Sequence, residues 1–357
     1  MQTALETIAT LSHEFGADDY VMGGGGNTSC KNEVTLWIKP SGTTLQALAP
    51  DRFIAMDRAR LAGLYTLAAP PDAAAREALV KSVMEAAVLP ATPGRASVEA
   101  PVHDSFQARF VVHTHPTLVN GVACSLGGAA FVRRRFPDAL WLDYCDPGYT
   151  LSLHVREALA DYRRRHGDRE PQVMWLENHG IFVAGDTADD IRAAYAAVME
   201  TLQAFYKHLG LPTAPPPAPP PPAPETAAAA ERVLRDTLGA EAAVVVAQGP
   251  VACAAGPVSP DHLVYAKSFV YEGLLTADAI QAFAARRGYL PRVFSTPDAI
   301  YACGATATTA SRAMAFAVNA AWIRQLARAC GGVQYLSDAA RRFLENWEVE
   351  SYRAKQS

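Results

Sequence analysis

The feature that most constrains this chain is a proline run at residues 211–224, LPTAPPPAPPPPAP. Each proline fixes φ and lacks a backbone N–H, so the run can form neither a helix nor a central strand. Such a segment is typical of an extended, semi-rigid polyproline II spacer. A proline-rich ligand for a recognition domain is the alternative, and we favour the spacer. The run therefore predicts two domains, residues 1–210 and 225–357, joined by a linker at 211–224.

Composition supports two domains and excludes some functions. The 357 residues are half apolar, enough to build more than one core. A net charge of -4 lacks the basic surface that nucleic acids or anionic membranes attract. The six cysteines show no CxxC spacing, which favours reduced thiols. With no signal-peptide pattern and no run near ~18 apolar residues, we expect a soluble cytoplasmic protein.

Strand and helix patterns alternate through the first domain, which indicates an α/β layer structure. The alternation by itself would suggest a parallel sheet. Helices are expected at 3–15, 58–68, 74–88, 99–108, 117–126, 151–166 and 187–209, and strands at 34–40, 51–57, 108–115, 172–178 and 181–185.

Two histidines end one of these strands. His113 and His115 are two residues apart, so on a strand their side chains lie on the same face. Two imidazoles side by side are half of a transition-metal site, although half-buried histidines bonded to the backbone would give the same pattern. His179 follows a second strand and precedes Gly180, where the chain can turn tightly. Three histidines with an open fourth position are typical of catalytic zinc, whereas His179 alone could be a turn histidine.

Three short segments could bind an anion. The stretch VMGGGGNTSCK is neither a Walker loop nor a full GxGxxG pattern. Its glycines and hydroxyls nonetheless suit an anion cup, with a flexible loop as the alternative. IKPSGTTL and GRASVEA are the other two segments. The candidate residues are Asn27, Thr28, Ser29, Lys39, Ser41, Gly42, Thr43 and Ser97.

Glu99 lies near the start of the helix expected at 99–108. A carboxylate is stabilised there by the helix dipole, which could fully account for it. Beside a metal, the same carboxylate could instead carry a proton during catalysis.

The second domain contains a weak echo of the first. LENHGIFVAGDTADDIRAAYAAVMETLQAF resembles STPDAIYACGATATTASRAMAFAVNAAWIRQLA in its order of apolar strand, glycine, threonine and alanine-rich helix. Ala299 or a neighbour replaces His179, and His262 is the only histidine after the linker. The echo predicts a smaller α/β domain of unknown role, either a degenerate repeat, which we prefer, or a recurring unit.

Together, GGGGNTS, WIKPSGTTL, SVEAPVH, VVHTHP and ENHGIFVAGDT resemble, in that order, the class II aldolase/adducin family across about residues 1–209. The family includes fuculose- and rhamnulose-phosphate aldolases. The resemblance implies an α/β/α sandwich with a mostly antiparallel central sheet, and we adopt this expectation in place of the parallel sheet.

The resemblance also implies a function and its residues. It implies a zinc-dependent aldolase that cleaves a ketose, in particular a ketose 1-phosphate, reversibly through a zinc-stabilised enediolate. Zinc would be bound by His113, His115 and His179, with Glu99 as general acid/base. The phosphate would be held by Asn27, Ser41, Gly42 and Ser97, and Lys39 could compensate for Val98, which replaces a family serine. Relatives form fourfold oligomers in which a neighbouring subunit supplies a tyrosine, here Tyr144 or Tyr149.

Alternatives remain open at this level. Other family activities are 4-epimerase, decarboxylase and dehydratase, and adducin-like binding proteins have lost the chemistry. Adducins lack the metal histidines that this chain keeps, so an enzyme is favoured. After the linker, PRVFSTPDAIYACGATA and FLENWEVESYRAKQS resemble the middle part of bifunctional rhamnulose-phosphate aldolase/alcohol dehydrogenases. Because no GxGxxG fingerprint occurs, we do not expect nicotinamide chemistry.

Overall fold

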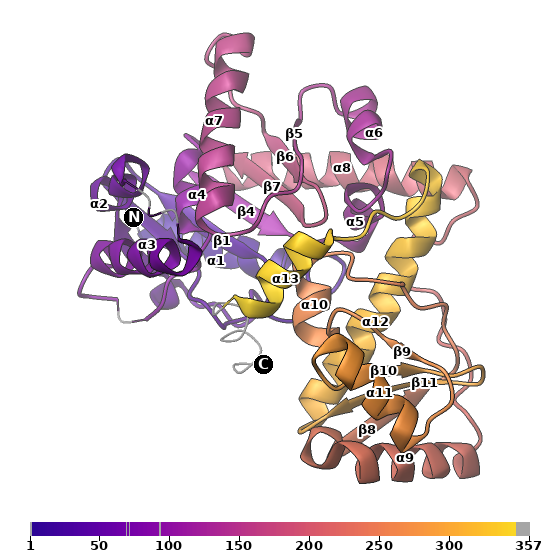
Figure 1. The fold of residues 1–357 in the computed structure, drawn as a ribbon. Helices are drawn as coiled ribbons and strands as arrows, with labels where there is room; N and C mark the ends of the chain where they lie inside the picture. Colours follow the sequence, from indigo (N-terminus) through magenta and orange to yellow (C-terminus); the bar gives the residue numbers. More distant parts are fainter. Residues whose placement is uncertain (1, 69, 71, 93, 348–357) are drawn as a thin grey trace. The chain divides into compact units, whose positions relative to one another are not determined.

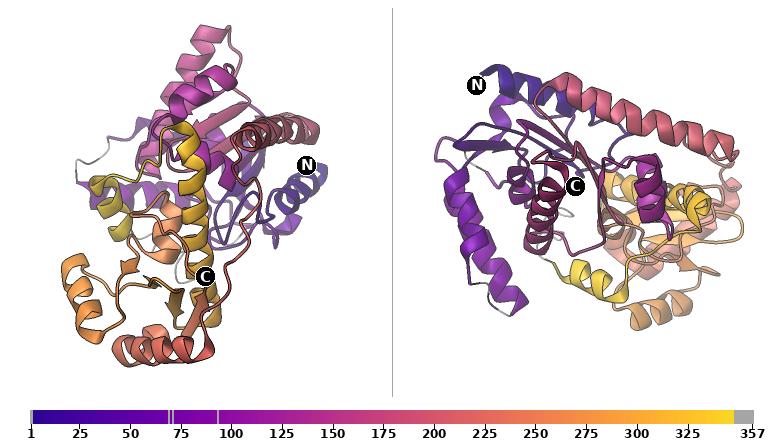
Figure 2. Two further views of the ribbon diagram at one scale, coloured as in Figure 1. Left: turned by 90° about the vertical axis from the view of Figure 1, so that its right-hand side faces the viewer. Right: turned by 90° about the horizontal axis from the view of Figure 1, so that it is seen from above.

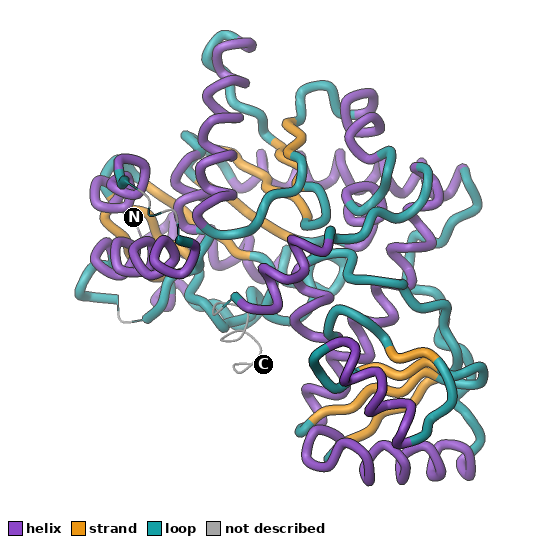
Figure 3. Tube along the Cα trace, viewed as in Figure 1, coloured by secondary structure: helices purple, strands orange, loops and turns teal. Residues whose placement is uncertain are grey.

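A computed structural model describes residues 2–68, 70, 72–92 and 94–347. The chain divides into two compact units, one comprising residues 1–119 and 128–202 and the other residues 120–127 and 203–357. Residues 211–223 form no helix or strand, and helix α9 (Pro224–Leu238) begins at the end of the proline run (Figure 3). The motif FLENWEVESYRAKQS ends outside the described residues.

The described part of the first unit is built on a seven-stranded sheet (Figure 1). Neighbouring strands are antiparallel except for the β5–β6 pair. The expected mostly antiparallel sheet is therefore confirmed. In spatial order the strands are β3 (Ile54–Asp57), β2 (Thr35–Ile38), β1 (Asn27–Lys31), β4 (Phe110–Thr114), β7 (Gly180–Gly185), β6 (Val173–Leu176) and β5 (Leu140–Leu142).

Helices cover both faces of this sheet, and alternate residues of β4 show which helix lies where. Val111 packs in a core cluster with Val102 of α4 and Val155 of α7. Thr114, three residues after Val111, has its side chain on the opposite face of the sheet. Its hydroxyl is hydrogen-bonded to the Tyr195 hydroxyl of α8, with the two oxygens 2.7 Å apart. Helix α1 accompanies α8 on that side (Figure 2). These layers confirm the expected α/β/α sandwich. The helices up to residue 210 are α1 (Gln2–Glu14), α2 (Arg58–Ala62), α3 (Ala73–Ala87), α4 (Ala100–Ser105), α5 (Thr117–Ala123), α6 (Gly128–Arg135), α7 (Tyr149–His166) and α8 (Ala188–His208).

Strand β1 corrects one expectation. Residues 27–29 were expected to follow the glycines as an open anion cup, but they form a fully paired strand between β2 and β4. Their side chains are buried. Gly23 and Gly26 have φ of 61° and 64°, which turns the chain directly into the sheet. The polar side chains of residues 27–29 therefore lie in the protein interior.

The second unit contains, in its described part, a four-stranded sheet in the order β8 (Val244–Gln248), β11 (Ile300–Gly304), β10 (Val293–Ser295) and β9 (Tyr271–Glu272). Its pairs are antiparallel, antiparallel and parallel. The series β4–β7–β6–β5 of the first unit has the same pairings in the same chain order. The remaining helices are α10 (Pro260–Ala266), α11 (Ala277–Arg287), α12 (Ala307–Ala327) and α13 (Asp338–Asn346).

The sheet of the second unit and the β4–β7–β6–β5 series of the first unit also share the register of their strand pairs. Gly185 ends β7 opposite Phe110, and Gly304 ends β11 opposite Val244. Each glycine contacts the first turn of the following 21-residue helix so closely that a Cβ would meet it at 2.6 or 2.5 Å. Counting along this register, Ala247 takes the place of His113. The degenerate repeat stays a prediction, and in this register β8 has no histidine at the position that corresponds to His113.

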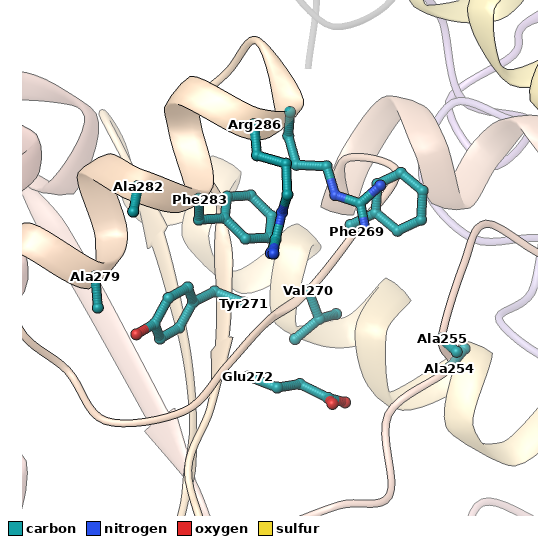
Figure 4. Close-up of a pocket in the computed structure, with 11 residues that line it drawn as sticks. Ala254, Ala255, Phe269, Val270, Tyr271, Glu272, Ala279, Ala282, Phe283 and Arg286 are labelled. Atoms are coloured by element: carbon teal, nitrogen blue, oxygen red, sulfur yellow. The ribbon is translucent and has the colours of Figure 1, made fainter.

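A pocket of about 470 Å³ lies within the second unit (Figure 4). Its aromatic and charged lining residues are Phe269, Tyr271, Glu272, Phe283, Arg286 and Arg287. The Arg287 guanidinium lies 3.6 Å from the centroid of the Phe269 ring. The lining contains no histidine or cysteine, so it lacks the nitrogen and sulfur ligands that transition metals prefer. Among the described helices of both units, none has the length and apolar content needed to cross a bilayer.

Candidate active site

Three histidines from two neighbouring strand ends converge in the first unit. His113 and His115 come from the end of β4, and His179 comes from the turn between β6 and β7. One ring nitrogen from each lies within 4.8 Å of the other two. The Nε2 atoms of His113 and His115 are 3.0 Å apart. In a tetrahedral zinc site with bonds of about 2.0–2.1 Å, ligand nitrogens lie about 3.3 Å apart.

His113 is held by the neighbouring strand β7. Its Nδ1 donates to the carbonyl oxygen of Ile181 at 2.8 Å, because a carbonyl can only accept. In the neutral ring, Nε2 therefore carries the lone pair on the side of His115. The ring stacks on Phe182 with centroids 3.9 Å apart and planes at 9°. Full burial of both rings fixes this orientation.

The turn at His179 depends on two unusual backbone positions. Asn178 has a φ of 54°, a left-handed conformation that asparagine adopts more readily than most residues. Gly180 then enters β7 so close to β4 that an added Cβ would lie 2.7 Å from His115 Cδ2. The chain turns tightly at His179, as expected, and Gly180 permits the close approach of β7 to the end of β4. This approach is what brings His179 to the other two imidazoles.

Glu99 lies beside the histidines as the residue that precedes α4. Its Oε1 is 3.5 Å from His113 Nε2 and 3.8 Å from His179 Nε2. This oxygen is buried and has no hydrogen-bond partner within the described residues. A buried carboxylate oxygen without a donor is costly, and a divalent cation among the three nitrogens would satisfy it. The donor set of three imidazoles, with this carboxylate oxygen beside it, therefore fits a divalent transition metal.

The other oxygen of Glu99 belongs to a hydrogen-bonded series. Asn27 Nδ2 donates to Glu99 Oε2 at 2.5 Å. Asn27 Oδ1 is bonded to His103 Nε2, and His103 Nδ1 lies 2.7 Å from Ser29 Oγ. Burial, with smaller effects of His113 and Lys31, holds the pKa of His103 well below its ordinary value. All four side chains are at least nine-tenths buried.

His103 was missed by the sequence analysis, although it stands in the quoted segment SVEAPVH. The available signal was its spacing, since it lies four residues after Glu99 and therefore one helical turn away. A second signal was the alternation of Asn27, Ser29 and Lys31, which places three polar side chains on one face of a strand.

Four of the predicted phosphate residues lie together in two adjoining segments. Ser41 N–H donates to the Arg95 carbonyl at 2.8 Å, and Ser97 N–H donates to the Lys39 carbonyl at 3.2 Å. Gly42, with a φ of 83°, follows in the turn. Ser97 Oγ accepts the N–H of Glu99 at 3.3 Å, which links these segments to the acid–base residue. Asn27, the fifth predicted member, instead has its amide on Glu99 and His103.

The two tyrosines considered from the sequence lie elsewhere in the first unit. The Tyr144 hydroxyl donates to Asp146 Oδ1 at 3.2 Å, and its backbone N–H donates to Glu177 Oε2 at 2.7 Å. Tyr149 begins α7 and is buried, with its hydroxyl 3.4 Å from the Leu64 carbonyl. Because the tyrosine was expected to serve a neighbouring subunit, its catalytic role stays a prediction.

Comparisons with known proteins identify a family for the first unit. Residues 6–206 match the model of the family described as Class II Aldolase and Adducin N-terminal domain. An uncharacterized oxidoreductase, YuxG, from Bacillus subtilis is 26% identical over 196 residues, which cover 52% of this chain. The chain spans only 27% of the length of that relative.

Solved structures also align with the chain. The N-terminal class II aldolase domain of a Thermoplasma acidophilum protein is 21% identical, with a TM-score of 0.48, covering 56% of this chain and 92% of that one. An L-fuculose-1-phosphate aldolase from Thermus thermophilus is 21% identical, with a TM-score of 0.37, covering 57% and 92%. YgbL of Escherichia coli, a putative aldolase/epimerase/decarboxylase, is 18% identical, with a TM-score of 0.42, covering 57% and 89%.

Proposed function

Because this chain belongs to the class II aldolase and adducin family, we propose that it is a zinc-dependent aldolase that cleaves a ketose reversibly, as a ketose 1-phosphate. The observation that carries the proposal is the position of Glu99 Oε1, buried and beside His113 and His179. A carboxylate next to three imidazoles would be placed to transfer a proton beside any metal ion that the imidazoles hold.

The three imidazoles are neutral ligands, so a bound zinc keeps its full positive charge. When bound there, zinc would polarise a ketone carbonyl and stabilise negative charge that develops on its oxygen. Glu99 would transfer a proton between its carboxylate and a carbon atom of the substrate. In cleavage, the substrate hydroxyl that becomes the aldehyde gives up its proton as the carbon–carbon bond breaks, and Glu99 delivers a proton to the carbon atom left by the broken bond. In condensation both proton transfers run in reverse, and Glu99 removes the proton from carbon.

The segments around Ser41 and Ser97 are proposed to bind the phosphate. Ser97 precedes Glu99 by two residues, and backbone hydrogen bonds join its segment to the one that contains Ser41 and Gly42. The two serine hydroxyls and the left-handed turn at Gly42 offer donors for an anion. The ammonium of Lys39 lies in the same turn, where it donates to the Thr43 carbonyl at 2.7 Å. We also propose a homo-oligomer in which a tyrosine such as Tyr144 completes the site of a neighbouring subunit.

The test has two parts, metal content and product analysis. Elemental mass spectrometry should find about one zinc per wild-type chain and far less in His179→Ala. His154→Ala, at an exposed histidine of α7, is the matched control and should retain the metal. The loaded enzyme is then incubated with ketose 1-phosphates and unphosphorylated ketoses, and the products are identified.

Aldehyde and ketone fragments would support the aldolase. An epimer, released carbon dioxide or a dehydrated product would replace it with another activity of the family. A wild-type protein that holds no metal after reconstitution would leave a non-catalytic, adducin-like binding protein as the better account.

A further inference from the structure

We propose that Ser29, His103 and Asn27 form a one-directional chain of hydrogen bonds that positions Glu99. In this chain Asn27 holds Oε2, and Oε1 is left as the oxygen that faces the three histidines. The three residues are positioning residues, since their described side-chain hydrogen bonds join them to one another and to Glu99 and include none of the three histidines of the cluster. The inference rests on the proposed function only in taking Glu99 as the acid–base group.

The direction of the chain follows from what each atom can donate. An ionised carboxylate only accepts, so Asn27 must present Nδ2 to Glu99. Asn27 Oδ1 then faces His103 Nε2, which must carry the ring proton. In a neutral imidazole Nδ1 is then an acceptor, and the Ser29 hydroxyl donates to it. Every donor therefore points toward Glu99.

The neutral state of His103 is built into the fold. The ring is fully buried, and burial lowers the pKa of His103. The Lys31 ammonium donates at 2.6 Å to the His103 carbonyl oxygen, so a positive charge already lies at this residue. Asn27, Ser29 and Lys31 alternate along β1, and all three contact His103 through its side chain or its carbonyl oxygen. These side chains on one face of β1 therefore fix the position of His103, the residue of α4 that orients the Asn27 amide.

The consequence concerns the two oxygens of Glu99. Oε2 is committed to a charge-assisted hydrogen bond from Asn27 Nδ2. Oε1 has no donor within the described residues and lies nearest the metal ligands. A carboxylate turned out of this plane would lose the Asn27 bond, so the chain holds one oxygen on Asn27 and leaves the other toward the histidines as the atom that gives and takes the proton.

The first test is independent of catalysis. Two-dimensional ¹H–¹⁵N spectra of histidine-labelled full-length protein report which ring nitrogen carries the proton. We expect His103 to show a protonated Nε2 and an unprotonated Nδ1 between pH 6 and 9. Its signals are assigned by their loss in His103→Gln, or by their selective shift in Ser29→Ala if the first variant does not fold. A protonated Nδ1, or an imidazolium, overturns the proposal.

The second test compares two buried hydroxyls on opposite faces of β1. Ser29→Ala removes the first donor of the chain, whereas Thr28→Val removes a hydroxyl that bonds Ser12 at 2.7 Å on the other face. We expect Ser29→Ala to lower kcat roughly fivefold to tenfold at unchanged KM, as loss of one hydrogen bond predicts. Thr28→Val should leave kcat unchanged even if its melting temperature falls. Equal losses of kcat overturn the proposal.

The outcomes separate this inference from the proposed function. A wild-type protein without aldolase activity, but with the expected His103 protonation, refutes the function and supports the chain. An active aldolase with the other His103 tautomer refutes the chain and leaves the function intact.

Discussion

Gly180 lies so close to Thr114 that a Cβ at position 180 would stand 2.3 Å from the Thr114 carbonyl oxygen. This contact joins the start of β7 to the end of β4, where the three histidines converge. We predict that Gly180→Ala forces the strands apart, lowers the free energy of unfolding by about 1–3 kcal/mol and weakens zinc binding. Chemical denaturation and a competitive chelator titration measure the two effects.

The control for this substitution is Gly63→Ala in the same unit. Gly63 has a φ of -55° and no atom within 4 Å of an added Cβ. Its replacement should be neutral or slightly stabilising. A Gly180→Ala protein as stable as Gly63→Ala would show that the strands do not approach as described.

A buried lysine predicts a dependence of stability on pH. Burial lowers the pKa of Lys31 from 10.5 to about 8, although Asp104 opposes the shift. Below about pH 8 both the folded and the unfolded chain bind this proton, and above about 10.5 neither does. Between these values only the unfolded chain binds it, so Lys31 makes the free energy of unfolding increase with pH, by about 3 kcal/mol in total.

Lys31→Met removes this titration. Compared with wild type, the variant should lack the increase between pH 8 and 10.5, as measured by urea unfolding at several pH values. Lys207→Met, at an exposed lysine in the last turn of α8, should follow the wild-type curve. Parallel curves for Lys31→Met and wild type would show that the folded protein keeps Lys31 charged at ordinary pKa.

Substrate discrimination should depend on the turn that holds Lys39 and Ser41. If this turn binds a phosphate, Lys39→Met removes a charge-assisted contact worth about 1.5–3 kcal/mol. We predict a KM roughly 10- to 100-fold higher for a ketose 1-phosphate, with little change for the unphosphorylated ketose. Ser82→Ala, on the exposed face of α3, is the control. An equal rise for both substrates would assign Lys39 to the stability of the turn alone.

Two helix caps test whether the units unfold separately. Thr306 Oγ1 accepts the Thr309 N–H at 3.1 Å at the start of α12, and Asp72 accepts the Ala75 N–H at 2.8 Å at the start of α3. Removing either cap costs about 1 kcal/mol. In a denaturation curve with two transitions, Thr306→Ala should shift one and Asp72→Ala the other. A common shift of a single transition would mean that the units unfold together.

Much of the first unit could be predicted from sequence patterns. The expected strand at 108–115 and helix at 187–209 correspond closely to β4 and α8, because long apolar periodicity survives in the fold. The alternation of helices and strands along the chain did not reveal that the strands pair mostly antiparallel. Strand pairing is a non-local property, and here the resemblance to a family was the better guide.

The segments that were missed share a physical cause. Strand β1 reads NTSCK and β5 has three residues, so neither shows an apolar alternation. Helix α6 ends in three arginines, which obscure its buried face of Phe131 and Val132. The histidine cluster was readable because its members follow recognisable strands. His103 was harder to assign, because its hydrogen-bond partners Ser29 and Asn27 lie more than 70 residues away and only its spacing from Glu99 and the polar alternation of β1 pointed to it.

The polar face of β1 has a consequence for how this chain can change. Asn27, Ser29 and Lys31 all contact one residue of α4, and each contact is buried. Substitutions at these positions should therefore be strongly non-additive, since the first loss leaves a partner unsatisfied and the second adds little. Over evolutionary time such a group is expected to vary as a block or not at all. On the opposite face of β1, Thr28 is hydrogen-bonded to Ser12 of α1, so substitutions there should be independent of this group.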